Sequence, residues 1–363
     1  MYFTFMLRFP QNAFMPLYPL YGKNILSAYP LPLQGVGDEI SPDITVYFDG
    51  YVNKDADGSP STTGRVWKKM GDGRLLEYYN RTGHNIRFLL SGDGSVIRIS
   101  QSWPDWRDTL FALMNPAMAA ALTLGGSTVL HASSLVWEGG SYLVMGVSGA
   151  GKSTLSAALA TEGMSVHSDD ITVLNKEFSD CMISGESADV SVIAAGYPRL
   201  KISPVLAEYL DIPASALLPV FVNPYDKPEY GVTTEAAGEP EKWVPADQLA
   251  GGFYPHPAPL KGIFILSERQ KEGKAALVER LSPLSAAIAL TGHYYGREWL
   301  RQANDSGLAV CSRLAQSIPV YRASMPDTLT RLQSSAKILF DEYIMGAIPP
   351  APVYPIKLQK SAL

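Results

Sequence analysis

A glycine-rich stretch in the middle of the chain has the residue types and spacing of a phosphate-binding loop. Gly146–Ser153 reads Gly-Val-Ser-Gly-Ala-Gly-Lys-Ser, which fits G-x-x-x-x-G-K-[ST] in full. Glycines allow a tight turn that points backbone N–H groups inward, and a helix that starts after them adds partial positive charge. Lys152 is expected to reach the β- and γ-phosphates of ATP, and the Ser153 hydroxyl to bind Mg²⁺. The residues predicted to contact the nucleotide are Gly146, Ser148, Gly149, Ala150, Gly151, Lys152, Ser153 and Thr154. The alternative is a glycine turn with a solvated lysine.

Two adjacent carboxylates, Asp169 and Asp170, follow one helix later in an otherwise apolar run, Met164–Leu174. Buried carboxylates are costly unless a cation pairs with them. If the run is one strand, the two side chains point to opposite faces. One of them could then bind Mg²⁺ while the other faces a substrate hydroxyl. The alternative is the solvent-exposed end of a strand.

Two histidines accompany this pair. His131 lies in the apolar run before the loop, where a hydrogen bond to Asp169 is expected, and His167 directly precedes the pair. A lone histidine in an apolar strand is also compatible with a satisfied core group, so both interpretations stay open for each residue.

The elements around the loop predict a βαβ unit. Apolar runs on either side of Glu138–Gly140 read as strands joined by a tight turn, and 152–163 reads as a helix capped by Gly163. Strand, loop, helix and strand indicate an α/β core. A Ser-Pro pair predicts a helix start at Ser282, and 325–345 reads as an amphipathic helix.

The first 110 residues have a different pattern. Short β-rich runs dominate, with a hairpin turn expected at Ser91–Gly94, and 109–126 reads as a helix interrupted by a proline. We therefore expect two domains: a β-rich N-terminal lobe over 1–110 and a phosphate-loop domain over 111–363. The aromatic, proline-rich stretch Phe221–Pro257 is a candidate lid over the site.

Bulk composition narrows the partners and the compartment. The chain has 363 residues and a formal net charge of −5 with no basic run, so nucleic acid is not expected as a partner. No run reaches the 18 apolar residues of a membrane helix, and prolines interrupt the apolar N-terminus, so neither a membrane span nor a signal peptide is expected. The two cysteines are far apart in sequence, which favours a reducing compartment and hence the cytoplasm. A homo-oligomer stays open.

The segment 127–174 resembles the catalytic domain of the HPr kinase/phosphorylase family and its relatives. The shared marks are a histidine in the strand before the loop, a Ser-Gly-x-Gly-Lys-Ser core, and an Asp-Asp pair one helix later. The resemblance is strong over that segment and patchy elsewhere. It implies an α/β P-loop kinase core like the C-terminal domain of HPr kinase, here with the N-terminal β-rich lobe attached.

The resemblance also implies roles. Asp169 would be the catalytic base that takes a proton from a serine hydroxyl, Asp170 its metal-side partner, and His131 the histidine beside the base. The chain departs from the family downstream, where 192–201 reads VIAAGYPRLK and lacks the glutamate of the family's Glu-x-Arg-Gly stretch. Arg199 and Lys201 are candidates there to hold substrate or phosphate. A recognisable HPr-docking stretch is absent as well, so HPr itself is not expected as the substrate.

Together these features predict an ATP- and Mg²⁺-dependent kinase that transfers the γ-phosphoryl group to a hydroxyl, such as a serine, of a peptide, protein or small molecule. A lasso-peptide precursor is one such acceptor among relatives of the family. The alternatives are a nucleotide-binding ATPase or regulator without phosphotransfer, an enzyme like PEP carboxykinase, and a binding module. The sequence leaves open the acceptor, the oligomeric state and any reverse phosphorylase activity.

Overall fold

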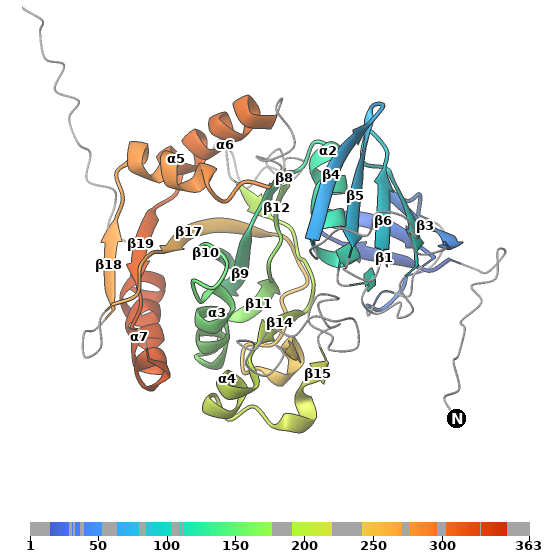
Figure 1. Cartoon of the computed structure of the whole chain (residues 1–363). Helices are drawn as coiled ribbons and strands as arrows, with labels where there is room; N and C mark the ends of the chain where they lie inside the picture. The colour runs from blue at the N-terminus through green and yellow to red at the C-terminus, as the bar shows by residue number, and fades with distance from the viewer. Residues whose placement is uncertain are drawn as a thin grey trace, which may run out of the picture.

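The protein is a mixed α/β structure built on three sheets, seen here in a computed structural model (Figure 1). The structure describes residues 15–28, 31, 33–36, 40–52, 64–79, 85–102, 109–110, 112–175, 191–219, 242–270, 276–295, 303–326 and 328–346. The two larger sheets use successive parts of the chain, 17–101 and 128–324, with the N-terminal sheet at one end of the central one.

The N-terminal sheet contains seven strands in the order β1-β2-β3-β7-β6-β5-β4. Their bounds are β1 Leu17–Leu20, β2 Lys23–Ser27, β3 Ile44–Tyr51, β4 Gly64–Met70, β5 Gly73–Tyr79, β6 Asn85–Leu90 and β7 Val96–Gln101. Alternate residues of β6, namely Ile86, Phe88 and Leu90, are buried, which is the two-residue period of a sheet with one covered face. The expected hairpin turn at Ser91–Gly94 joins β6 to β7.

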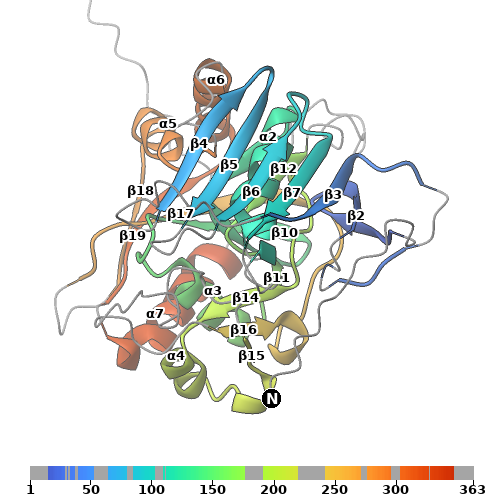
Figure 2. The same ribbon diagram turned by 45° about the vertical axis from the view of Figure 1, so that its right-hand side comes forward.

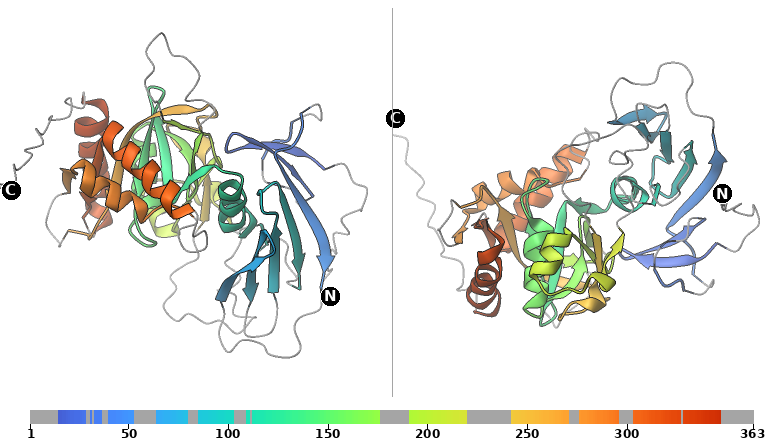
Figure 3. Two further views of the ribbon diagram at one scale, coloured as in Figure 1. Left: turned by 90° about the horizontal axis from the view of Figure 1, so that it is seen from above. Right: turned by 60° about the horizontal axis from the view of Figure 1, so that its bottom comes forward.

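A helical segment covers the buried face of this sheet. It consists of a π-helix, η1 (Leu113–Ala117), that contains Pro116 and continues into α2 (Met118–Leu124). A proline removes one backbone donor and disfavours a regular α-turn before it, which fits the wider local helix. Seen from above, this segment lies between the two large sheets (Figure 3). The predicted boundary between residues 110 and 111 stays untested, and the helix just after it packs in the same core as the N-terminal strands.

The central sheet contains nine strands, seven of them in the order β11-β9-β10-β17-β13-β12-β8, with β19 beside β17 and β18 beside β19. Strands β10, β17 and β19 are parallel neighbours. The bounds are β8 Thr128–Leu130, β9 Ala132–Trp137, β10 Gly140–Met145, β11 Ser165–Ser168, β12 Thr172–Asn175, β13 Val192–Ile193, β17 Ala258–Leu266, β18 Leu277–Arg280 and β19 Val320–Ser324.

Helices cover both faces of the central sheet. On β10, Tyr142 and Val144 belong to one core cluster, and Leu143 and Met145 belong to the cluster on the other face. The first face is covered by α3 (Lys152–Thr161) and α7 (Leu332–Leu339), and the second by α5 (Pro283–Thr291) and α6 (Ala303–Ser317) (Figure 1). The continuous apolar character of β10 follows from this double coverage.

A small third sheet completes the region below α3 (Figures 1 and 2). It pairs β14 (Arg199–Ile202) with β16 (Lys242–Pro245), and β16 with β15 (Leu218–Pro219). The short helices of this region are α4 (Pro204–Tyr209), η2 (Ala214–Ala216) and η4 (Ala246–Gln248). Of the candidate lid, 242–257 falls in this region, and its earlier part, including Phe221, lies outside the described residues.

Several local predictions are confirmed. Residues Glu138 and Gly139 form the tight turn between β9 and β10, Gly163 takes a positive φ of 107° just after α3, and Ser282 caps α5 by accepting from the Ser285 N–H. The predicted 325–345 helix is wrong at its start, because a 3₁₀ turn, η5 (Leu329–Arg331), precedes α7. A π-helix, η6 (Phe340–Met345), follows it.

Two predicted strands are each interrupted. The run 128–137 divides into β8 and β9 at His131, and the run 164–174 divides into β11 and β12 at Asp169–Ile171. The expectation that Asp169 and Asp170 sit mid-strand on opposite faces is therefore wrong. Asp170 has a φ of +62°, which no strand residue adopts.

The N-terminal sheet touches the central part of the molecule through the turn between β1 and β2. The backbone N–H of Tyr21 donates to the Ala195 carbonyl at 2.9 Å. The Tyr21 side chain is buried against Gly196, where an added Cβ would lie 2.7 Å from the Tyr21 ring. This contact brings the N-terminal hairpin next to the carboxylate pair Asp169 and Asp170.

Candidate functional site

The glycine-rich loop connects the end of β10 to the start of α3. Gly149 and Gly151 take positive φ angles of 79° and 98°, which residues with a side chain rarely adopt. A Cβ on Gly146 would lie 2.9 Å from the Ala150 Cβ, so the loop closes tightly there. No side chain caps the N-terminus of α3 at Gly151, and the first N–H groups of a helix form an anion-binding site.

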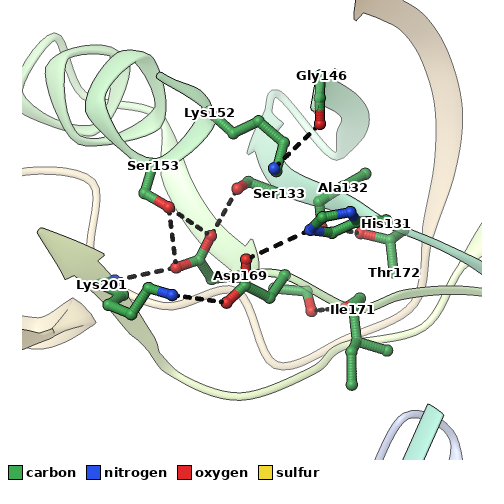
Figure 4. A network of polar contacts seen from close by, with 12 residues as sticks. His131, Ala132, Ser133, Gly146, Lys152, Ser153, Asp169, Ile171, Thr172 and Lys201 are labelled. Carbon is green, nitrogen blue, oxygen red and sulfur yellow. Dashed lines mark hydrogen bonds and ion pairs between the residues drawn. The ribbon is translucent and has the colours of Figure 1, made fainter. Parts of the chain in front are cut away.

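Lys152 begins α3 and is buried. Its Nζ donates to the Gly146 carbonyl oxygen at 3.1 Å, across the mouth of the loop (Figure 4). Burial lowers the pKa of the Lys152 ammonium, and the charges of Asp170 and Asp169 oppose that shift. An ammonium held by one carbonyl is available for a phosphate oxygen that enters the loop.

Asp169 lies in the bend after β11 and accepts hydrogen bonds from three directions (Figure 4). The donors are the Ser133 hydroxyl at 2.5 Å, the Lys201 backbone N–H at 2.9 Å, and the Ser153 hydroxyl at 3.3 and 3.4 Å from the two carboxylate oxygens. Burial raises the pKa of Asp169 and the adjacent Asp170 raises it further, while the hydrogen bonds from Ser133 and the Lys201 backbone lower it. Asp169 therefore directly contacts the hydroxyl that the sequence assigns to Mg²⁺.

Asp170 faces a different set of partners. Its carboxylate lies 3.4 Å from the Lys201 Nζ and 3.8 Å from the His131 Nε2. Burial opposes ionisation of Asp170, but the nearby His131 ring and the charge of Lys201 outweigh it and hold the pKa below its usual range. The predicted hydrogen bond from His131 to Asp169 is therefore wrong, because the broken strand turns Asp170, and not Asp169, toward the histidine.

The two strand breaks lie side by side, which is why these residues meet. Strand β9 pairs with β11 and β8 pairs with β12, so the gap at His131 faces the gap at Asp169–Ile171. The Thr172 hydroxyl donates to the Ala132 carbonyl at 2.9 Å across the gaps. The polar side chains therefore lie inside the sheet, while the strand pairs on either side of the gaps keep their backbone hydrogen bonds.

His167 is placed elsewhere and has a structural role. Its ring nitrogens contact the Ser134 hydroxyl at 3.2 Å and the His256 carbonyl at 3.0 Å, and burial lowers its pKa to about 4. No described contact joins His167 to either aspartate.

The glycine-rich loop is also tied to a distant residue, because the Gly149 carbonyl oxygen accepts a hydrogen bond from the Arg269 guanidinium at 3.2 Å.

A pocket opens beside the carboxylates between the N-terminal lobe and the central part. Together with its mouth it encloses about 340 Å³. It is lined by Tyr21, Met114, Asn115, Asp169, Asp170, Tyr197, Arg199, Lys201 and Trp243. The structure thus brings the predicted Arg199 and Lys201 to the aspartates. Trp243 comes from the candidate lid 221–257. Sequence reasoning missed Ser133, Tyr21, Asn115 and Tyr197, of which Ser133 left a signal, as a hydroxyl in an apolar strand.

The oxygen atoms of Ser153 and Asp169 could supply part of the ligand shell of a magnesium ion. Among the described residues no group of three or more His, Cys, Asp or Glu side chains could hold a metal. Mg²⁺ usually takes one or two protein carboxylates and completes its shell with phosphate oxygens and water, so Ser153 and Asp169 are a sufficient pair.

In the part of the chain that the structure describes, no helix is long and apolar enough to span a membrane.

Comparisons with known proteins give no family assignment. No family model and no curated protein matches the chain. A solved structure, the HPr(Ser) kinase/phosphatase from Coxiella burnetii, matches with 13% identity, covering 58% of this chain and 93% of that one, at a TM-score of 0.26. A TM-score this low does not indicate a shared function. A functional assignment for this chain therefore depends on the geometry of its site.

Proposed function

We propose that this protein is an ATP-dependent kinase that transfers the γ-phosphoryl group to a hydroxyl acceptor. The observation that carries the proposal is the convergence of a glycine-rich loop, the Lys152 ammonium and a pair of buried carboxylates at the strand breaks of the central sheet. Positioning and charge neutralisation account for most of the rate in phosphoryl transfer. The loop and Lys152 supply positive charge, and the aspartates supply a metal ligand and a base.

The positions of the two aspartates favour the reverse of the division implied by the resemblance. Asp169 contacts Ser153, so we assign it to the metal side. Bound Mg²⁺ would neutralise charge on the phosphates. Asp170 faces the pocket between Lys201 and His131, so we assign it as the base. His131 is then a positioning residue for Asp170.

In the proposed reaction, the acceptor oxygen forms a bond to the γ-phosphorus while the bond between that phosphorus and the β–γ bridging oxygen breaks. The proton of the acceptor hydroxyl passes to Asp170, and ADP leaves with the bridging oxygen. Lys152 stabilises negative charge on the transferring group. The charge of Lys201 lowers the pKa of Asp170, so that carboxylate is ionised but a weaker base, and its assignment rests on its position facing the pocket.

Incubation with γ-labelled ATP, Mg²⁺ and a panel of hydroxyl compounds and serine peptides tests this function. We expect label to move from ATP onto an acceptor, with little label released as free phosphate. Release of free phosphate alone, with every acceptor unlabelled, would favour the ATPase alternative and contradict the kinase assignment. The Lys152→Ala protein serves as the control for contaminating kinases.

A further inference from the structure

The pocket beside Asp170 contains an arginine whose charge no described residue neutralises. The Arg199 guanidinium lies over the rings of Tyr197 and Trp243, with its central carbon 5.2 and 5.5 Å from the ring centroids. Within the described ranges it makes no hydrogen bond or ion pair through its side chain. The neighbouring acids do not supply one, because Asp169 is bound by Ser133 and Lys201, and Asp170 by Lys201 and His131.

A second polar group in the same pocket, the Tyr197 hydroxyl, is also left without a partner by the described residues. The Tyr197 side chain is 6% exposed, and its hydroxyl makes no hydrogen bond to any of them. A buried hydroxyl without a partner is costly, so native structures usually satisfy it. Both Tyr197 and Arg199 line the pocket, and a ligand there could accept from both.

The chemistry of these groups selects an anion. A guanidinium presents several N–H donors in a planar fork that matches the oxygens of a carboxylate or a phosphate. The aromatic rings hold its flat body in place, which leaves the N–H groups to face a ligand.

We propose that this pocket binds the phosphoryl acceptor, and that it selects acceptors in which the reacting hydroxyl is accompanied by a carboxylate or phosphate group held by Arg199 and Tyr197. The N-terminal lobe shapes the subsite, because Tyr21 from the β1–β2 turn and Asn115 from η1 are among the residues that line it. The inference rests on the proposed kinase function. It assigns the N-terminal lobe a part in acceptor recognition.

The test is a calorimetric titration of protein whose phosphate loop is filled with Mg²⁺ and a non-hydrolysable ATP analogue. The probes are D-glycerate, glycerol 3-phosphate and uncharged glycerol, which share a carbon skeleton and differ in charge. We expect saturable binding of one or both anions and none of glycerol. Preference between the two anions reports which group the subsite takes.

Variants separate recognition from folding. Arg199→Gln is expected to weaken anion binding about tenfold or more, the effect of losing a charge-assisted hydrogen bond. Tyr197→Phe removes a hydroxyl that has no described partner, so it should weaken binding several-fold without lowering the melting temperature. The matched control is Arg98→Gln, another arginine over a tyrosine ring, which lies in the N-terminal sheet and should leave binding unchanged.

Equal binding of glycerol and the anions, no binding of any probe, or unchanged affinity in Arg199→Gln would overturn the proposal. The kinase function fails separately, by absence of binding of the ATP analogue. In that case the same titration on Lys152→Ala protein without nucleotide still reads the Arg199 subsite, because the phosphate loop has lost its ammonium group.

Discussion

Lys152→Ala lowers kcat/KM for phosphotransfer by about 10³-fold or more, if the loop binds ATP as proposed. The Lys152 ammonium is buried at the start of α3 and its described hydrogen bond goes to a loop carbonyl, so its charge can turn to a phosphate. Alanine has no group that can replace this charge. Initial rates with γ-labelled ATP, over a range of ATP concentrations, measure the effect.

The fold should survive this change. Lys152 occupies the first position of a helix, where alanine is favourable, and its removal relieves the burial of a charge. The matched control is Lys337→Ala on α7, an exposed lysine paired with Asp341, which should leave the rate unchanged. Wild-type rates in a folded Lys152→Ala protein would show that the loop is not the phosphate site.

Asp170→Asn and Asp169→Asn are expected to fail in different ways. Without a base at residue 170, the transfer rate should fall by about 10²–10⁴-fold while the Mg²⁺ dependence of nucleotide binding stays normal. Asparagine at 169 keeps one oxygen, which can accept from the Lys201 N–H, while its NH₂ group would face the Ser133 hydroxyl, which can accept in turn. It loses the negative charge beside Ser153. The Mg²⁺ concentration that supports half-maximal activity should therefore rise.

Magnesium titrations of rate and of nucleotide affinity on both variants separate the two roles. If Asp169→Asn kept its Mg²⁺ dependence and lost only transfer, while Asp170→Asn needed more Mg²⁺, the division implied by the sequence resemblance would be restored. Melting temperatures of the two variants provide the folding control, since both replacements are nearly isosteric.

The local elements around the loop could be predicted because their signals lie close together in sequence. Glycines at positive φ, the turn at Glu138–Gly139 and the cap at Gly163 each depend on a few neighbouring residues. The Ser282 cap is of the same kind. The residue types of the loop also set its chemistry, so the candidate nucleotide contacts are accessible from sequence alone.

The parts that sequence could not give depend on distant pairing. The breaks at His131 and at Asp169–Ile171 follow from how β8, β9, β11 and β12 share partners, which an uninterrupted apolar run does not reveal. For this reason the sequence places the histidine beside the wrong aspartate. The pocket is missed because Tyr21 lies more than a hundred residues before Arg199, and only the packing of the hairpin on Ala195 and Gly196 brings the two together.

The most direct test of the central claim is the stability of the protein with and without Mg²⁺ and ATP. A ligand that binds only the folded state at about a hundred times its dissociation constant adds about 2.7 kcal/mol of stability. We predict such a rise in the melting transition for the wild-type protein, and a much smaller one for Lys152→Ala. An unchanged wild-type transition at millimolar Mg²⁺ and ATP would contradict the assignment of Gly146–Ser153 as a phosphate-binding loop.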